Sequence, residues 1–149
     1  VYDGDMPTPA ERIAELEAGG NALRIARLPS GYLVLSEDGY LPGYCLLLAA
    51  PLAPSLEELD AERRAAYLGD VGRIGAALKA VVGCKRVNYG IYGNVDPFLH
   101  CHFWPRYEWE EAPFSTMPPL AWPGERRERE RARNAEAHLA LLSRLREAF

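Results

Sequence analysis

The amino-acid sequence predicts an α+β fold, in which an antiparallel five-stranded sheet packs against one long helix and a second helix lies at the C-terminus. Two observations lead to this prediction. Three short apolar runs before residue 50 are joined by turns too short for a crossover helix, and such connections favour antiparallel strands. Two further strand-like runs follow one long amphipathic segment, so strands and helices do not alternate as they do in parallel α/β folds.

The first half of the chain predicts one short helix and three strands. Residues 9–19 predict a helix that the Gly19-Gly20 pair ends. The predicted strands cover residues 22–28, 32–35 and 43–49, and each is bounded by turn residues. These turn residues are Pro29-Ser30-Gly31, Glu37-Asp38-Gly39 and Pro51.

Residues 60–82 predict the long helix. Apolar residues recur there at helical spacing, at Leu68, Val71, Ile74, Leu78, Val81 and Val82. Asp60 can cap the first turn, and Gly83 stands where a C-terminal cap would. Just upstream, Ser55-Leu56-Glu57-Glu58 has the form of a capping box. The spacing indicates one amphipathic helix packed on a sheet.

The second half of the chain predicts two more strands, a proline-rich loop and a helix. The strands cover residues 88–94, which end in a Gly-Asn turn, and residues 98–106. We expect the apolar loop at 112–124 to lie against the body of the domain, and residues 125–149 to form a charged helix with a narrow apolar stripe. The chain is therefore expected to be one domain, residues 1–149, with a core of about 20–110 and an extension at 111–149.

Composition narrows the class of protein. The 149 residues carry a formal net charge of −4, so the chain lacks the positive footprint of a nucleic-acid binder. No apolar run is long enough to span a bilayer, and residues 1–5 show no signal-peptide pattern, so neither a membrane partner nor export is expected. Three scattered cysteines, Cys45, Cys84 and Cys101, indicate buried free thiols in a reducing cytoplasm rather than disulfides or a zinc site.

Two of the three histidines stand two residues apart in the last predicted strand. Side chains two apart on a strand share a face, so His100 and His102 project together, with Phe98 and Trp104 beside them. Two such histidines could also bind a metal, but zinc needs a third ligand, and His138 lies far off in the C-terminal helix. We therefore expect no metal and no cofactor.

An amide-rich turn precedes this pair of histidines. Asn88 and Asn94 carry side-chain amides, and Gly93 allows a close backbone approach or a positive φ. Both asparagines could simply hold the turn, since Asn suits turns by itself. Amides and exposed N–H groups beside paired imidazoles are also what chemistry on a phosphate group requires.

Residues 87–107 (VNYGIYGNVDPFLHCHFWPRY) resemble the signature of the histidine triad family, His-x-His-x-His followed by two apolar residues and often Pro-Arg. Residues 41–48 similarly resemble the Pro-Gly-containing strand of that family, and the helix from Asp60 falls where its long helix belongs. The resemblance covers about residues 20–110. It implies a homodimeric enzyme that hydrolyses or transfers nucleotidyl groups, in or near the diadenosine polyphosphate hydrolase-like branch. The aromatic-rich region around residues 104–122 is the expected dimer interface, or a surface that stacks on a base.

The resemblance also implies the roles of individual residues. His100 would be the nucleophile that takes up the nucleotidyl group, with its Nδ1–H held by a main-chain carbonyl near residue 98, and His102 would be the third histidine of the triad. Asn94 would contact phosphate, and the turn at Ser36-Glu37 falls where relatives bring a polar group to the ribose.

For two other polar residues, a role at the site and a purely structural role both remain open. Asn88 could contact the substrate or only hold its turn, and Arg106 could place a permanent charge near the site or pair with a carboxylate such as Glu108 or Glu110. Tyr44 stands where some relatives have another histidine.

Phe98 departs from the family pattern, because it stands where the first histidine of the triad belongs. A phenylalanine side chain can neither donate a hydrogen bond nor protonate a leaving group. Two interpretations follow: a hydrolase with reduced turnover or altered preference, or a nucleotide-binding module without turnover. We expect the Phe98 side chain at the pocket edge. If it lies instead in a closed apolar cluster, an imidazole there would be buried without a partner.

Overall fold

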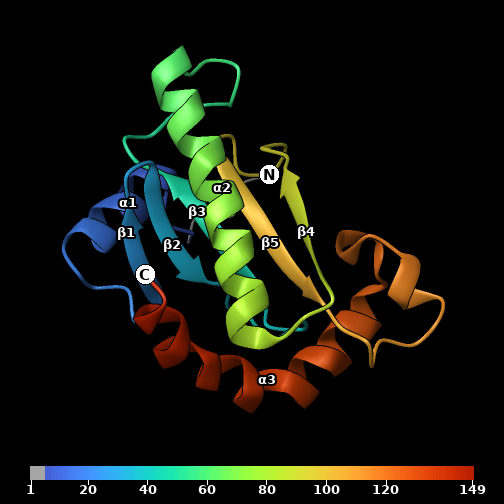
Figure 1. Ribbon diagram of the computed structural model, residues 1–149. Helices are drawn as coiled ribbons and strands as arrows, with labels where there is room; N and C mark the ends of the chain where they lie inside the picture. Colours follow the sequence, from blue (N-terminus) through green and yellow to red (C-terminus); the bar gives the residue numbers. More distant parts are fainter. Residues whose placement is uncertain (1–5) are drawn as a thin grey trace.

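The computed structural model describes residues 6–149, and the prediction made for residues 1–5 lies outside the described part. One sheet forms the centre of the molecule, with α2 lying across one of its faces (Figure 1). In chain order the elements are α1 (Pro9–Glu17), β1 (Arg24–Leu28), β2 (Gly31–Leu35), β3 (Cys45–Ala49), α2 (Ala61–Val82), β4 (Arg86–Ile91), β5 (His100–Arg106), the 3₁₀ turns η1 (Phe114–Thr116) and η2 (Pro119–Ala121), and α3 (Gly124–Glu147). The strand order is β1-β2-β3-β5-β4, and every pair is antiparallel. The predicted α+β fold is confirmed.

Local signals in the sequence account for where the long helix starts and stops. The Asp60 side chain accepts the Arg63 N–H at 2.8 Å and caps α2, and Gly83 ends the helix with a left-handed φ of 67°. Ser55 does not begin a helix, although the residues that follow it have the form of a capping box. Residues 55–59 form turns and bends, because the helix is capped at Asp60 instead.

The last two strands have boundaries that differ from those the sequence patterns predict. β4 begins at Arg86, two residues earlier than predicted, and ends at Ile91, so Tyr92 lies outside the strand. The predicted Gly93-Asn94 turn follows, and Gly93 adopts there a φ of 77° that favours glycine. β5 starts at His100, because Phe98 still belongs to a turn in which its N–H bonds the Asp96 carbonyl.

The sheet separates two layers of different character. The layer under α2 is the main apolar core, in which Cys101 and Phe103 of β5 pack with Leu47 of β3 and Ile74 and Leu78 of α2. The opposite layer holds a smaller cluster under α1: Ile13, Leu16, Tyr32, Val34, Leu48, Ala50 and Phe98. Period-2 alternation along β5 therefore places His100 and His102 on the face that α2 does not cover.

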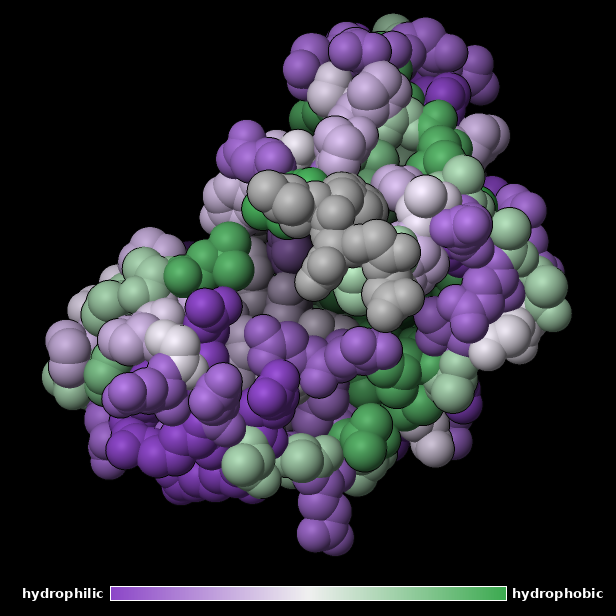
Figure 2. Space-filling model, turned by 180° about the vertical axis from the view of Figure 1, so that it is seen from behind, coloured by the Kyte–Doolittle hydropathy of each residue, from purple (hydrophilic) through white to green (hydrophobic). Residues whose placement is uncertain are grey.

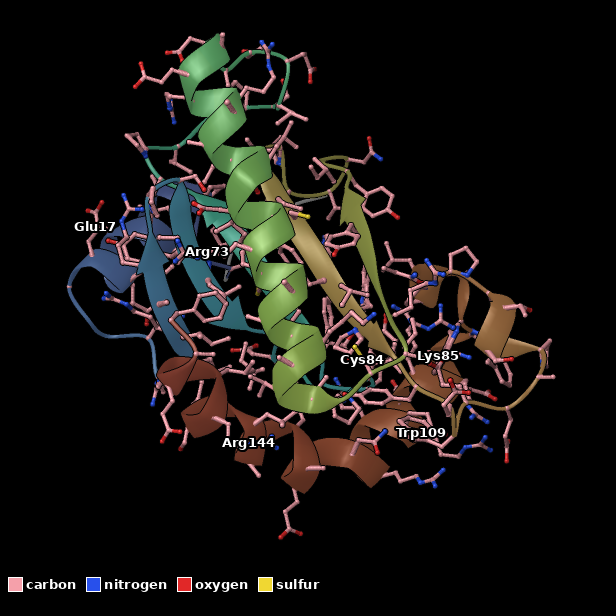
Figure 3. The ribbon with its side chains drawn as sticks, in the orientation of Figure 1. Glu17, Arg73, Cys84, Lys85, Trp109 and Arg144 are labelled. Carbon is pink, nitrogen blue, oxygen red and sulfur yellow. The ribbon has the colours of Figure 1, made fainter. Side chains whose placement is uncertain are left out.

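The C-terminal extension packs against one end of the sheet and of α2. α3 runs below the sheet and contacts α2 and β1 (Figure 1). Arg144 of α3 donates to the Val81 carbonyl near the end of α2 (Figure 3). The proline-rich segment lies against the body as predicted, with Trp122 only 2% exposed. Trp122 and Trp104 are buried within the chain, so these two tryptophans do not support the expected dimer interface.

The remaining predictions from composition concern membranes and thiols. None of the helices within residues 6–149 combines the length and apolarity that crossing a membrane requires. All three cysteines are free and buried, and Cys84 lies between the end of α2 and β4 (Figure 3). Burial raises the pKa of each thiol, so none offers a thiolate at neutral pH.

Candidate functional site

The two paired histidines lie in the middle of the sheet, on the strand between β3 and β4. His100 is opposite Leu48 of β3, and His102 is opposite Leu46 on one side and Gly90 of β4 on the other. Their ring centroids are 4.9 Å apart in an edge-to-face arrangement. The predicted shared face is thus observed. Figure 2 shows the molecule from the side opposite α2, where hydrophilic side chains gather over the lower part of the view, along α3.

A backbone carbonyl fixes the protonation of His100. The Nδ1 atom lies 2.8 Å from the Phe98 carbonyl oxygen, and the side chain is buried. A carbonyl can only accept a hydrogen bond, so Nδ1 carries the ring proton. In the neutral imidazole Nε2 then keeps its lone pair, which is the form that can attack an electrophile.

Aromatic side chains surround His102. Its ring is parallel to the indole of Trp104, with 1° between planes and 4.9 Å between centroids, and Tyr92 packs at a tilt 6.0 Å away. The Tyr44 hydroxyl lies 2.7 Å from Nδ1. Burial, assisted by the nearby His100, lowers the pKa of His102 to about 4, while Asp96 opposes the shift. His102 is therefore a neutral imidazole at physiological pH.

Phe98 occupies a closed apolar cluster rather than a pocket edge. It lies on the same side of the sheet as the histidines, with its ring centroid 4.8 Å from that of His100, but it is only 4% exposed. Leu48 of β3 and Ile13 and Leu16 of α1 pack in the same cluster. The expectation of a pocket-edge position is wrong, because α1 folds over this part of the sheet.

The turn before β5 lies beside the histidines. A Cβ atom built on Gly93 would be 3.9 Å from the carbonyl oxygen of Phe98, which is the hydrogen-bond acceptor of His100. Asn94 is exposed on this turn, and Asp96 forms an ion pair of 2.8 Å with Arg12 of α1. The turn is therefore tied to α1 and leaves the Asn94 amide accessible to a ligand.

The Arg106 side chain is held by other groups of the protein and has no hydrogen-bond donor left for a substrate. All five N–H groups of its guanidinium are engaged. Their acceptors are both carboxylate oxygens of Glu110, the side-chain oxygen of Asn88, and the carbonyls of Phe114 and Met117. The structure thus favours the interpretation in which Arg106 pairs with Glu110, and it does not support substrate binding by Arg106. The oxygen of Asn88 is occupied at 2.7 Å by the same guanidinium.

Ser36 and Glu37 lie at the start of the loop that leads to Tyr44. The backbone N–H of Ser36 bonds the Tyr44 carbonyl, and its hydroxyl accepts the Asp38 N–H at 3.0 Å. Glu37 is exposed next to α3, where it borders a small hollow with Arg131 and His138. Within residues 6–149 no hydrogen bond or ion pair joins either residue to His100 or His102, so their ribose-binding role stays a prediction.

His138 holds the loop before Tyr44 in a way that the sequence pattern does not reveal. Its Nδ1 accepts the Gly43 N–H at 3.1 Å, so Nε2 carries the proton and donates to the Ser36 carbonyl at 2.7 Å. A Cβ on Gly39 would collide with the ring at 2.3 Å. The loop at 36–43 is therefore wrapped around the His138 imidazole. A single histidine on a charged helix carries no sequence signal for this role.

A metal centre finds no support in the described side chains. No group of three or more His, Cys, Asp or Glu residues within 6–149 is arranged to hold an ion.

Several solved structures resemble this chain. No family model and no curated protein matches it. Among solved structures, a histidine triad protein of Bradyrhizobium japonicum is 24% identical, with a TM-score of 0.57 over 86% of this chain and 92% of that one. One from Sinorhizobium meliloti is 25% identical, with a TM-score of 0.54 over 76% and 87%. A Hit-like protein of Bartonella henselae, described as involved in cell-cycle regulation, is 17% identical, with a TM-score of 0.63 over 100% and 99%.

These likenesses agree with one another in the fold that they identify. The chain has the histidine triad fold, as the motif around His100 and His102 predicted.

Proposed function

We propose that this chain, which has the histidine triad fold, binds a nucleotide against its His100–His102 face and hydrolyses it through a nucleotidyl-histidine intermediate. The observation that carries the proposal is the hydrogen bond from His100 Nδ1 to the Phe98 carbonyl. This bond depends only on the backbone at position 98. The nucleophile's tautomer is therefore preserved although the first histidine of the triad is absent.

The proposed reaction has two steps. In the first, Nε2 of His100 attacks the α-phosphorus, a P–N bond forms, and the bond from phosphorus to the leaving group breaks with its electron pair going to that group. In the second, water attacks the same phosphorus, the P–N bond breaks, and a nucleoside monophosphate and one proton are released. His102, Asn94 and the N–H groups of the Gly93-Asn94 turn would hold the non-bridging oxygens as charge develops on them.

The environment of the site favours a leaving group that needs no proton. Phe98 has no proton to give, and the lowered pKa of His102, about 4, leaves that residue neutral. A phosphate leaving group departs as an anion, whereas an amine leaving group must be protonated. We therefore propose phosphoanhydrides, and dinucleoside polyphosphates such as diadenosine tetraphosphate in particular, rather than phosphoramidates. This preference agrees with a diadenosine polyphosphate hydrolase-like activity.

A nucleotide-binding module without turnover is the second candidate. The observation that favours it is the burial of Phe98, which is 4% exposed and packed beside His100. An apolar ring at this position removes one polar partner from the reacting groups, while the rest of the face stays available to a ligand.

Assembly and location complete the proposal. A homodimer is supported by β4, which lies at an edge of the sheet, and by exposed apolar side chains on it or just after it: Tyr89, Ile91, Tyr92 and Val95. A cytoplasmic location is supported by the three buried free thiols.

The test combines mass spectrometry with kinetics. We expect incubation with diadenosine tetraphosphate to add the mass of one adenylyl group transiently and to release adenosine monophosphate. An adenosine phosphoramidate, which carries the same adenylyl group, should react about 100-fold more slowly, in line with the usual contribution of a positioned acid. Saturable binding without labelling or product would support the binding module, and neither binding nor labelling would contradict both candidates.

A further inference from the structure

Tyr44 makes a contact with His102 that the nucleotide-hydrolase scheme does not yet use. Its hydroxyl lies 2.7 Å from His102 Nδ1, and its ring stacks on Trp104 with 5.2 Å between centroids. Trp104 in turn lies parallel to the His102 ring. Tyr44 is 5% exposed, so this hydrogen bond is shielded from water. The two aromatic residues and the imidazole form one packed unit.

The direction of this hydrogen bond follows from the chemistry of the two groups. Burial raises the pKa of the Tyr44 phenol, and the neighbouring Tyr40 and Asp38 raise it further, so the phenol keeps its proton. The Ser36 side chain opposes this shift. A phenol is a better donor than an imidazole N–H, and an imidazole nitrogen is a better acceptor than a phenol oxygen. The phenol proton therefore points to Nδ1.

We propose that Tyr44 is a positioning residue that fixes His102 in the tautomer with its proton on Nε2. His100 has the opposite tautomer, because the Phe98 carbonyl holds its proton on Nδ1. The pair then presents a lone pair on His100 Nε2 and an N–H donor on His102 Nε2. A nucleophile beside a donor matches an electrophilic phosphorus that carries anionic oxygens. The catalytic consequence rests on the proposed hydrolase function, but the tautomer does not.

The fold holds Tyr44 in place through the C-terminal helix. Tyr44 follows directly on the loop at 36–43, and His138 of α3 bonds both ends of that loop, at the Ser36 carbonyl and the Gly43 N–H. Gly39 leaves the space that the His138 ring fills. The position of the phenol is therefore set by α3, an element outside the region that resembles the triad signature.

Nitrogen-15 NMR of the histidine rings tests the tautomer directly. At pH 7 we expect His102 to show a protonated Nε2 and an unprotonated Nδ1. Tyr44→Phe keeps the stacked ring and removes only the hydroxyl, so a fraction of the Nδ1–H tautomer should appear. A protonated Nδ1 in the unaltered protein, or an unchanged His102 spectrum in Tyr44→Phe, would overturn the proposal.

A matched variant separates the hydroxyl from the ring. Tyr92 also packs on His102, but within residues 6–149 no hydrogen bond joins its phenol to that imidazole. Tyr92→Phe should therefore leave the His102 tautomer as it is. With diadenosine tetraphosphate as the probe, Tyr44→Phe should lower kcat by roughly 5- to 10-fold, the usual value of one hydrogen bond, without a matching change in KM. The spectrum decides the tautomer even if no turnover occurs, so a failure of the hydrolase proposal is recognised separately.

Discussion

Arg106 and Glu110 form an ion pair of 2.8 Å at the end of β5, with side chains that are 6% and 0% exposed. The same guanidinium holds Asn88 of β4 and the carbonyls of Phe114 and Met117. One buried cation thus joins the last two strands to the proline-rich segment, which covers Trp104 and, through it, supports the ring of His102.

Breaking this pair should destabilise the protein. Glu110→Gln leaves a buried guanidinium without its counter-charge, and we expect a loss of about 3 kcal/mol in the free energy of unfolding. The next residue provides a control, because Glu111 is 75% exposed and lies 3.7 Å from Arg126. Glu111→Gln should change stability by less than about 0.5 kcal/mol. Urea denaturation of both variants measures the difference, and equal midpoints would contradict the structural role of Arg106.

Replacing the nucleophile should stop turnover and leave the fold intact. His100→Ala removes Nε2, so release of adenosine monophosphate from diadenosine tetraphosphate and the transient adenylyl label should both disappear. Nucleotide affinity should be largely retained, as measured by calorimetry. Turnover at the unaltered rate in a purified variant that is free of contaminating hydrolases would refute the proposed mechanism.

Restoring a histidine at position 98 should cost stability rather than raise activity. The cluster around Phe98 is closed and apolar, so Phe98→His would bury an imidazole without a partner, at a cost of about 1–3 kcal/mol. Phe98→Leu keeps the site apolar and should cost less than about 1.5 kcal/mol. Thermal melting compares the two. A stable Phe98→His variant with higher kcat would show that this position opens to the substrate.

Stability should fall as the solution becomes acidic. Burial lowers the pKa of both His102, to about 4, and His138, below the value of 6.5 that an unfolded chain has. The unfolded state therefore binds more protons, and the stabilisation is complete above pH 6.5 and is lost progressively as pH falls towards 4. Urea midpoints between pH 7.5 and 5 should show this decline. His138→Gln removes one of the two groups and should flatten the curve, and an equally steep decline would exclude His138 as a contributor.

The proposed dimer should depend on the edge strand. Sedimentation at micromolar concentration should give roughly twice the chain mass of 16.6 kDa. Ile91→Arg places a charge among the exposed apolar residues of β4 and should shift the protein to a monomer. Leu139→Arg, a change at an exposed leucine of α3, should leave the mass unchanged. A monomer in the unaltered protein would contradict the assembly.

Much of the fold could be predicted because its signals are local. Asp60 and Gly83 mark the ends of α2 by capping chemistry, and the alternation around Cys101 and Phe103 determines which side of β5 faces the core. The boundaries that differ lie where a contact made elsewhere decides the outcome. β5 begins at His100 rather than at Phe98, whose side chain packs under α1.

The candidate site likewise has some features that a short segment determines and others that depend on tertiary packing. Two histidines with period-2 spacing and the triad-like motif around them are properties of a short segment, so the sequence by itself determined the paired imidazoles, their shared face and the loss of the first histidine at Phe98. Only the tertiary structure decided that Phe98 is buried under α1 and that the N–H groups of Arg106 bind groups of the protein. It also decided that the Tyr44 hydroxyl lies beside His102 and that His138 holds the loop before Tyr44. The Tyr44–His102 and Gly43–His138 hydrogen bonds join residues 58 and 95 positions apart, and they form only once the sheet and α3 have packed.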